Sequence, residues 1–329
     1  MKISVLGCGR WGSFIAWYQA TVLKHSVILY GEEGRESYEV LKSQSKNEYV
    51  ALDKSITLSC DLEYALKQSD VIIISISSQS LREFMQKVIK YPVSEKIFVL
   101  CMKGLEVTTG KRLSEVMTES GISSDKIAVW VGPGHIQSFT AGVPNCMVID
   151  SENAKLKKYF AENFRSNLIR FYYGDDLLGT EVGAAAKNVL GIAAGVLDGS
   201  GYASLKGPLM ARGAFEVAKL IKAMGGNEMS AYGLAHLGDY ETTLFSPYSH
   251  NRMYGEMLAK GKKFDKLAEG VMTAKAMMEL GIEYNIDLPI TNAVYEACFL
   301  SDGFGKGEHD CMRVILKLFE RSVKNEFRF

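Results

Sequence analysis

The stretch that decides the fold is Met1-Lys-Ile-Ser-Val-Leu6, which runs straight into Gly7-Cys-Gly-Arg-Trp-Gly12. An apolar strand followed by a G-x-G-x-x-G turn and an apolar helix is typical of a dinucleotide-binding βαβ unit. Gly7 permits the tight turn, Gly9 lets the backbone approach a pyrophosphate, and Gly12 lets the helix pack on the strand. A helix over 13–23 and a strand over 26–30 complete the unit. The sequence therefore predicts a dinucleotide site rather than a purely structural turn.

Composition indicates a globular protein of two domains with no bias toward nucleic acid. Its 329 residues suffice for two domains, and 47% apolar residues can fill their cores. Lysine plus arginine and aspartate plus glutamate both number 38, so the chain lacks the basic footprint of a nucleic-acid binder. Six scattered cysteines without a C-x-x-C pair favour reduced thiols in the cytoplasm and no metal site. We expect no signal peptide and no membrane span, because the first strand begins at once and the apolar runs are short.

The first half alternates short apolar runs with amphipathic stretches, a pattern that predicts a parallel sheet covered on both faces. Helices are expected over 61–68 and 80–90. The predicted strands cover 3–6, 27–30, 71–76, 97–101, 128–131 and 146–149. The expected class is therefore α/β, with a Rossmann-like, doubly wound, mostly parallel sheet.

The second half is rich in alanine, leucine, methionine and lysine, and its strand-like runs almost vanish. Amphipathic patterns predict helices over 209–224, 264–280 and 311–323. We therefore expect a dinucleotide-binding domain over 1–180 and an all-helical C-terminal domain over 181–329, which would carry the substrate and catalytic residues.

Cofactor preference depends on the residues after the second strand. Glu32 lies 20 residues past Gly12, where an acidic side chain usually binds the ribose 2′-hydroxyl and repels a 2′-phosphate. This position favours NAD. Arg35 is close enough to leave NADP open, and both Glu32 and Glu33 also fit the solvated start of a helix.

Two strand ends in the first half carry candidate site residues. The carboxyl ends of parallel strands face the ligand crevice in this class of fold, and Lys103 follows one of them. A solvated surface lysine is the alternative. The segment Gly132-Pro-Gly134-His135 follows another and offers unobstructed backbone amides, although a structural turn explains it equally well.

The stretch Glu181-Val-Gly-Ala-Ala-Ala-Lys187-Asn188-Val-Leu-Gly-Ile-Ala-Ala-Gly195 predicts a helix buried on most sides. Lys187 and Asn188 are its polar exceptions. Burial lowers the pKa of a lysine, and a lowered pKa suits a general base near pH 7. The alternative is that Lys187 extends its ammonium group to solvent.

These segments together resemble the NAD(P)-dependent glycerol-3-phosphate dehydrogenases of bacterial type. The resemblance covers about residues 1–300 and preserves the family's order. It rests on Gly7–Gly12, Lys103-Gly104, Gly132-Pro133, Ala186-Lys-Asn-Val189, Leu237-Gly-Asp239, Ser249-His-Asn-Arg252 and Glu269-Gly270.

The resemblance implies interconversion of sn-glycerol 3-phosphate and dihydroxyacetone phosphate with NAD(P)(H), in support of glycerophospholipid synthesis, by a homodimer. It makes Lys187 the proton acceptor, Lys103 a contact of substrate and cofactor, and Asp239 a partner of substrate and lysine. With the motif glycines and Glu32, the expected cofactor residues are Gly7, Gly9, Arg10, Trp11, Gly12, Glu32, Lys103, Ile136, His250 and Glu269. The expected substrate residues are Lys103, Gly132, Gly134, Lys187, Asn188, Asp239, Thr243, Ser249, His250, Asn251 and Arg252.

Two departures from the family pattern leave the substrate open. The family usually has arginine where this chain has His250, and a hydroxyl residue followed by Phe where it has Gly134-His135. Histidine carries only part of a positive charge at neutral pH and cannot form a bidentate fork with a phosphate. The two histidines either rebuild an anion or polyol pocket or are unrelated. A dehydrogenase of another polyol phosphate or hydroxy acid is therefore a second hypothesis, and a nucleotide-sensing protein without catalysis is a third.

Overall fold

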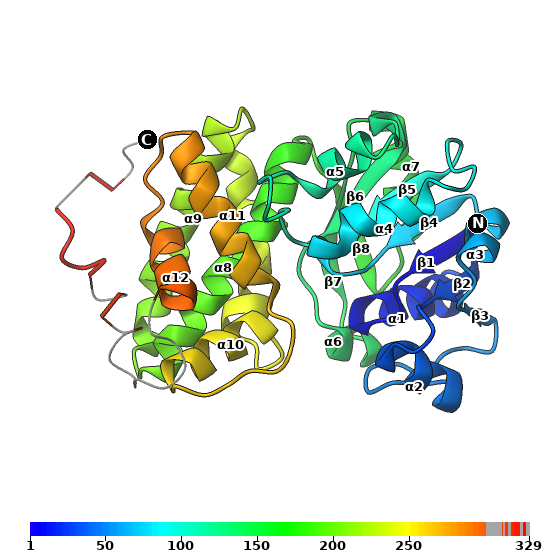
Figure 1. Cartoon of the computed structure of the whole chain (residues 1–329), viewed down its shortest axis with the longest axis horizontal. Helices are drawn as coiled ribbons and strands as arrows, with labels where there is room; N and C mark the ends of the chain where they lie inside the picture. The colour runs from blue at the N-terminus through cyan, green and yellow to red at the C-terminus, as the bar shows by residue number, and fades with distance from the viewer. Residues whose placement is uncertain (301–310, 312, 315–316, 323–324, 327–329) are drawn as a thin grey trace. The chain divides into compact units, whose positions relative to one another are not determined.

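The computed structural model describes residues 1–300, 311, 313–314, 317–322 and 325–326, and it divides into two compact units (Figure 1). We call the first unit the sheet domain; it comprises Met1–Met102 and Leu113–Leu177. The second, the helical domain, comprises Lys103–Arg112 and Leu178–Phe329. This division differs from a single cut after residue 180 chiefly in that the loop Lys103–Arg112 belongs to the helical domain.

One eight-stranded sheet forms the sheet domain, in the order β3-β2-β1-β4-β5-β6-β7-β8. Neighbouring strands are parallel except β6 and β7, which are antiparallel. The order of the first six strands is that of a doubly wound dinucleotide fold, so the predicted class is confirmed. The strands are β1 (Lys2–Leu6), β2 (Ser26–Tyr30), β3 (Ile56–Ser59), β4 (Val71–Ile74), β5 (Ile97–Leu100), β6 (Ile127–Val131), β7 (Asn145–Asp150) and β8 (Ile169–Tyr173).

All six predicted strands are present, and their ends shift by at most two residues. Sequence analysis missed the two edge strands, β3 and β8. Each buries only its first residue, Ile56 or Ile169, and its other residues are intermediate or exposed, so neither shows the continuous apolar run of a central parallel strand.

Helices and short helical turns connect these strands. The helix predicted over 13–23 begins earlier, at Arg10, because Gly9 is its N-cap, and its last turn widens into a π-helix. The helical elements are α1 (Arg10–Trp17), η1 (Tyr18–Val22), α2 (Glu36–Gln44), α3 (Leu62–Gln68), η2 (Ser78–Ser80), α4 (Leu81–Val88), α5 (Leu113–Glu119), η3 (Ser124–Lys126), α6 (Ile136–Thr140) and α7 (Ala154–Phe164).

Aromatic side chains fix α1 to the sheet domain's core. Phe14 stacks on Phe139 at a ring distance of 5.1 Å, and the Tyr18 ring lies 6.0 Å from that of Trp130. The buried Tyr18 hydroxyl donates to the Phe164 carbonyl at 2.6 Å. This packing holds the N-terminus of α1 at the carboxyl end of β1, where the glycine-rich turn joins them.

The helical domain is built around α8, whose residues from Gly179 to Leu197 are all buried. None of the described helices is both long enough and apolar enough to cross a bilayer. Of the helix expected over 311–323, residues 311, 313 and 314 are helical, whereas 317–322 form turns and irregular chain, so the prediction is wrong there; residues 312, 315, 316 and 323 lie outside the described part of the chain. The elements of the domain are α8 (Leu177–Gly199), η4 (Ala203–Leu205), α9 (Lys206–Ala223), η5 (Glu228–Tyr232), η6 (Leu237–Asp239), η7 (Glu241–Phe245), α10 (His250–Ala259), α11 (Glu269–Glu283) and α12 (Pro289–Phe299).

Two glycines let α8 and α10 touch backbone to backbone. A Cβ on Gly195 of α8 would lie 1.9 Å from the Arg252 carbonyl oxygen, and one on Gly255 of α10 would lie 2.0 Å from the Ile192 carbonyl oxygen. Any side chain at either position would push the helices apart. The small residues of α8 therefore set the depth at which α10 packs.

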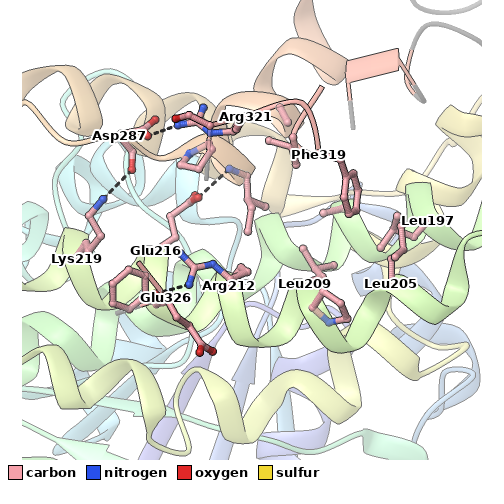
Figure 2. Close-up of a pocket in the computed structure, with 18 of the residues that line it drawn as sticks. Leu197, Leu205, Leu209, Arg212, Glu216, Lys219, Asp287, Phe319, Arg321 and Glu326 are labelled. Carbon is pink, nitrogen blue, oxygen red and sulfur yellow. Dashed lines mark hydrogen bonds and ion pairs between the residues drawn. The ribbon is translucent and has the colours of Figure 1, made fainter. Parts of the chain in front are cut away.

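A cavity of about 980 Å³ lies among α8, α9, α12 and described C-terminal residues, and Glu216 is one of the residues lining it (Figure 2). The Glu216 side chain is buried, and its carboxylate accepts from the backbone amides of Ile290 and Thr291, each at 2.8 Å. The N-cap residue of α12, Leu288, has no side-chain acceptor for these amides. Glu216 thus caps α12 from a neighbouring helix.

We expect Glu216→Ala to lower the free energy of unfolding by about 1–3 kcal/mol, because the first-turn amides of α12 lose a buried acceptor. Urea denaturation followed by circular dichroism measures this change. Glu228→Ala is the matched control, since Glu228 pairs with Lys222 at an exposed site. Equal midpoints for the two variants would show that Glu216 does not cap α12.

Candidate active site

Three charged residues of the helical domain, Lys103, Lys187 and Asp239, form a buried trio. One carboxylate oxygen of Asp239 accepts from the Lys103 ammonium at 2.7 Å and lies 2.8 Å from the Lys187 ammonium. The Asp239 side chain is 1% exposed, that of Lys187 9% and that of Lys103 19%. Two cations therefore share one buried anion, and the trio carries a net positive charge.

This arrangement lowers the pKa of both Lys187 and Asp239, for different reasons. Burial lowers the pKa of Lys187, with Lys103 adding to the effect, and Asp239 limits the fall, so the pKa is about 8. Burial raises the pKa of Asp239, but the two ammonium groups outweigh it, and the net pKa is lowered. Lys187 can therefore gain or lose a proton near neutral pH while Asp239 stays ionised.

Hydroxyl groups from one turn hold the trio in place. Thr243 accepts from the Lys187 ammonium at 2.8 Å, which fixes the direction of that side chain. The Thr242 hydroxyl donates to the second carboxylate oxygen of Asp239 and lies 3.1 Å from its backbone carbonyl. Both threonines are buried, so these bonds act without competition from solvent.

The loop 103–112 is anchored to α8 at both ends. Asn188 donates to the Lys103 carbonyl at 2.9 Å, and Arg112 forms an ion pair with Glu181 at 3.0 Å. Leu105 is fully buried among the apolar residues of the domain. These contacts explain why Lys103, which follows a strand of the other domain in sequence, reaches Asp239.

Two asparagines extend the site across three helices. The Asn251 amide donates to the Asn188 side-chain oxygen at 3.0 Å, and its own oxygen accepts from the Gly270 backbone amide at 2.9 Å. This chain of bonds joins α8, α10 and the start of α11. Asn188 and Asn251, both expected to bind substrate, therefore lie beside Lys103 with fixed amide orientations.

The remaining expected residues of this region, at the start of α10, have defined partners of their own. Ser249 is the N-cap of α10, where its hydroxyl accepts from the Arg252 amide at 3.3 Å. His250 lies 3.2 Å from the Leu267 carbonyl through Nδ1, so this nitrogen carries the hydrogen. The guanidinium of Arg252 binds Asp198 at 2.8 Å and Glu256 at 3.0 Å.

In the sheet domain, the three motif glycines occupy the positions that sequence analysis gave them. Gly7 has φ +110°, and a Cβ on it would lie 2.3 Å from the Ser75 carbonyl oxygen. A Cβ on Gly12 would lie 1.8 Å from the Gly7 carbonyl oxygen. A Cβ on Gly9 would meet no atom within 4 Å, so the turn is open at this point. The open turn and the first-turn amides of α1 fit a pyrophosphate.

The other expected cofactor residues lie at several places in the chain. The Arg10 guanidinium lies 5.2 Å from the Tyr49 ring centre, and Trp11 packs on Phe14 at 5.0 Å. Ile136 is 1% exposed, so its side chain belongs to the core. In the helical domain, Glu269 begins α11.

Glu32 follows β2 at the predicted ribose position and is partly exposed. It pairs with Lys87 at 3.0 Å and with Arg35 at 3.3 Å. The hydrogen bond from Lys87 is the main cause that lowers the pKa of Glu32. An ionised Glu32 fits the ribose of NAD, while Arg35, its partner, offers a cation that a 2′-phosphate could use.

Gly132 and Gly134 follow β6 with φ values of +124° and +145°, so both need glycine. A Cβ on Gly134 would lie 2.3 Å from the Phe139 ring. His135, next in the chain, is the N-cap of α6. The segment is thus a strained turn with a structural reason for its glycines, and its predicted contact with substrate stays a prediction.

Sequence analysis missed several residues that build the site. Thr242 donates to Asp239, and Arg112 forms an ion pair with Glu181. His236 bonds to the Gly183 carbonyl and to Tyr240. Tyr240 and Thr242 follow Asp239 closely in the sequence, so their proximity to Asp239 is the signal that could have identified them. No sequence pattern indicates that Arg112 pairs with Glu181, because the two residues are 69 positions apart.

Two features define this protein as a nicotinamide-dependent dehydrogenase. One is a doubly wound sheet with an open glycine-rich turn, and the other is a buried lysine with a pKa of about 8 beside an aspartate. Comparison with known proteins identifies the family within this class.

Two family descriptions match the chain and together cover most of it. Residues 2–157 match the N-terminal part of NAD-dependent glycerol-3-phosphate dehydrogenase, and residues 176–303 match its C-terminal part. The chain therefore belongs to the NAD-dependent glycerol-3-phosphate dehydrogenase family.

Individual relatives agree with this assignment over nine tenths or more of their length. The chain is 34% identical to glycerol-3-phosphate dehydrogenase [NAD(P)+] of Prosthecochloris aestuarii, covering 99% of this chain and 100% of that protein. It is 33% identical to the Bacillus pumilus protein of the same name, with 91% and 90% covered.

Among solved structures, glycerol-3-phosphate dehydrogenase from Coxiella burnetii superposes with a TM-score of 0.87 at 26% identity, covering 97% of this chain and 99% of that one. A D-mandelate dehydrogenase with NADH shares only the fold, at 15% identity and a TM-score of 0.61 over 91% of this chain and 98% of that one.

We expect Asp239→Asn to lower the pKa of Lys187 below its value of about 8, because the neighbouring anion that opposes the effect of burial is lost. The change should also destabilise the fold by about 3–5 kcal/mol, since two buried ammonium groups keep no counter-charge. Carbon-13 NMR of the lysine Cε groups across pH measures the pKa, with the Lys187 signal identified by its absence in Lys187→Met. A pKa that stays at 8 or rises would mean that Asp239 does not control Lys187.

Proposed function

We propose that this protein interconverts sn-glycerol 3-phosphate and dihydroxyacetone phosphate with NAD(H) or NADP(H). The observation that carries the proposal is the Lys103–Asp239–Lys187 trio, in which a buried lysine with a pKa of about 8 lies beside a second cation. Family membership and a glycine-rich turn with room for a pyrophosphate support it further.

The chemistry divides between coenzyme and protein. A bound nicotinamide supplies the hydride acceptor for alcohol oxidation and the hydride donor for ketone reduction. In the oxidation direction, neutral Lys187 accepts the proton of the C2 hydroxyl as the C2 hydride departs. In the reduction direction, the Lys187 ammonium returns that proton to the oxygen. Each direction needs a different protonation state of the same side chain.

Lys103 and Asp239 complete this mechanism without exchanging protons. The Lys103 ammonium stabilises negative charge that develops on the C2 oxygen, because it is held by Asp239 and needs little reorganisation. The negative charge of Asp239 offsets the repulsion between the Lys103 and Lys187 ammonium groups and so keeps them close together. Thr243 directs the Lys187 ammonium and thus the line of proton transfer.

The other proposed contacts rest on the family resemblance. We propose that Asn188, Ser249, His250 and Asn251 approach the substrate, with Gly132 and Gly134 offering backbone amides. Arg252 is proposed to contact the substrate as well, from a guanidinium that Asp198, Glu256 and the Ser246 carbonyl hold in place. We propose that the turn Gly7–Gly12 binds the coenzyme. The family resemblance adds as its contacts Arg10, Trp11, Glu32, Lys103, Ile136, His250 and Glu269.

We also propose a cytoplasmic location and a homodimer. All six cysteines are free thiols in the structure, as expected of a reducing compartment. The homodimer rests on the family resemblance, and light scattering after size exclusion tests it. The product, glycerol 3-phosphate, is the backbone unit of glycerophospholipids, so we propose that it feeds their synthesis.

A second candidate is a dehydrogenase of another polyol phosphate or hydroxy acid. The observation that favours it is His250, whose Nδ1 is committed to the Leu267 carbonyl. In its neutral form the ring then presents only the lone pair of Nε2, which does not bind phosphate. Turnover of dihydroxyacetone phosphate compared with unphosphorylated dihydroxyacetone and with 2-oxo acids distinguishes the two candidates.

We expect Lys187→Met to reduce kcat for dihydroxyacetone phosphate reduction by about 10²–10⁴-fold, because the proton donor is lost. NADH should still bind with nearly its original affinity. Loss of NADH absorbance at 340 nm measures turnover, and quenching of protein fluorescence measures binding. Loss of coenzyme binding together with turnover would assign Lys187 a structural role.

Lys206→Met is the matched control for that experiment. Lys206 is as buried as Lys187, at 7% exposure, but its ammonium binds Asp198 and the Leu244 carbonyl. This variant should lose stability and keep kcat within about tenfold, since no reacting proton passes through it. A loss as large as that of Lys187→Met would show that removing any buried lysine of the domain abolishes turnover.

The lowered pKa of Lys187 predicts opposite pH dependences for the two directions. The kcat/KM for glycerol 3-phosphate oxidation should rise roughly tenfold per pH unit and level off above about pH 8, where the amine is neutral. The kcat/KM for ketone reduction should fall above about pH 8 for the same reason. Steady-state rates between pH 6 and 10 test this, and profiles that move in the same direction would contradict it.

A further inference from the structure

Three residues before Asp239 lies a buried histidine that the mechanism above does not use. His236 and Tyr240 are both fully buried, and they flank the turn η6 that carries Asp239. Their rings meet edge to face at 4.8 Å, and the Tyr240 hydroxyl lies 2.5 Å from His236 Nε2. This hydrogen bond therefore joins the residues at the two ends of the turn.

The hydrogen positions of this pair follow from its partners. His236 Nδ1 lies 2.8 Å from the Gly183 carbonyl, which can only accept, so Nδ1 carries the hydrogen. Nε2 is then an acceptor, and the Tyr240 hydroxyl donates to it. Every polar atom of the imidazole is satisfied, and the tautomer is fixed from both sides.

The pair is also electrically neutral over the working range of the enzyme. Burial lowers the pKa of His236 to about 4, with Lys187 lowering it further and the Gly183 carbonyl and Asp239 opposing. Burial raises the pKa of Tyr240 far above its usual value, with Glu216 and Tyr232 adding to the effect. The pair therefore does not titrate where Lys187 does.

What the pair binds connects it to the catalytic lysine. Gly183 lies four residues before Lys187 on α8, so in the helix its carbonyl also accepts the backbone amide of Lys187. A Cβ on Gly183 would lie 3.0 Å from the Cβ of His236, so the ring packs against the helix backbone itself. One peptide carbonyl thus joins the turn that carries Asp239 to the turn that carries Lys187.

We propose that His236 and Tyr240 together fix the position of the Asp239 turn along the axis of α8. This position holds the Asp239 carboxylate against the ammonium groups of Lys187 and Lys103. The proposal rests on the proposed role of Lys187 for its effect on turnover, but its geometric part is independent of the substrate. His236 and Tyr240 are positioning residues, because they act on the reaction only through Asp239 and Lys187.

The test replaces the pair by apolar side chains of similar size, His236→Leu with Tyr240→Phe. Removing both partners leaves no buried hydroxyl without an acceptor, so the double variant should fold with a thermal midpoint close to that of the wild type. We expect kcat to fall by about tenfold or more, because a small displacement of the reacting groups is costly, while the affinity for NADH is unchanged. The pKa of Lys187, measured by lysine Cε NMR, should move down toward its value in Asp239→Asn.

A conservative variant separates positioning from general packing. In His236→Asn the side-chain amide nitrogen stands near the place of Nδ1 and can still donate to the Gly183 carbonyl. This variant should recover kcat and the pKa of Lys187 most of the way to wild type, and Tyr240→Phe alone should shift both by a smaller amount in the same direction as the double variant. Tyr18→Phe is the matched control, since it removes an equally buried hydroxyl from the sheet domain, and it should leave both readouts unchanged.

The NMR readout keeps this proposal distinct from the proposed function. If dihydroxyacetone phosphate is not a substrate, turnover is absent in every variant, yet the pKa of Lys187 still reports whether the pair holds Asp239. A double variant with the wild-type pKa of Lys187 would overturn the proposal. So would a His236→Asn variant that is as impaired as the double variant.

Discussion

One carboxylate that serves two ammonium groups is the constraint on which the helical domain depends. Asp239 is almost completely buried, and Lys103 and Lys187 both lie within 2.8 Å of one of its oxygens. Taking three charges out of water is costly, and their mutual attraction offsets this only when the geometry is well fixed. The surrounding structure must therefore supply that geometry, and most of the polar bonds near α8 do so.

The unusual composition of α8 follows from this demand. The helix is buried along almost all its length, and Gly195 lets α10 approach it backbone to backbone. That approach places Asn251 within reach of Asn188, and Asn251 in turn accepts from the Gly270 amide in the first turn of α11. A helix with larger side chains would bury as much apolar surface but would hold its neighbours, and their polar groups, too far from Lys187.

Much of the fold and part of the site could be predicted from sequence. The central strands are recognisable by their continuous apolar runs, and the glycine spacing defines the dinucleotide turn. The edge strands β3 and β8 each bury only one residue and were therefore missed. Lys187 stands out because a lysine in a small, apolar helix needs a physical reason. The partners of that lysine are harder to find, since the bonds to Asp239 and Thr243 join residues more than 50 positions apart. Periodicity contains no information on such long-range pairs.

The membership of residues 103–112 in the helical domain affects how the protein can be dissected. The chain passes from one domain to the other three times, after Met102, after Arg112 and after Leu177. A fragment that starts at Leu178 would lack the buried Leu105 and would leave Glu181 without Arg112. No single backbone cleavage yields two self-sufficient halves, so the two domains must be inherited, exchanged and expressed as one gene segment rather than shuffled as independent modules.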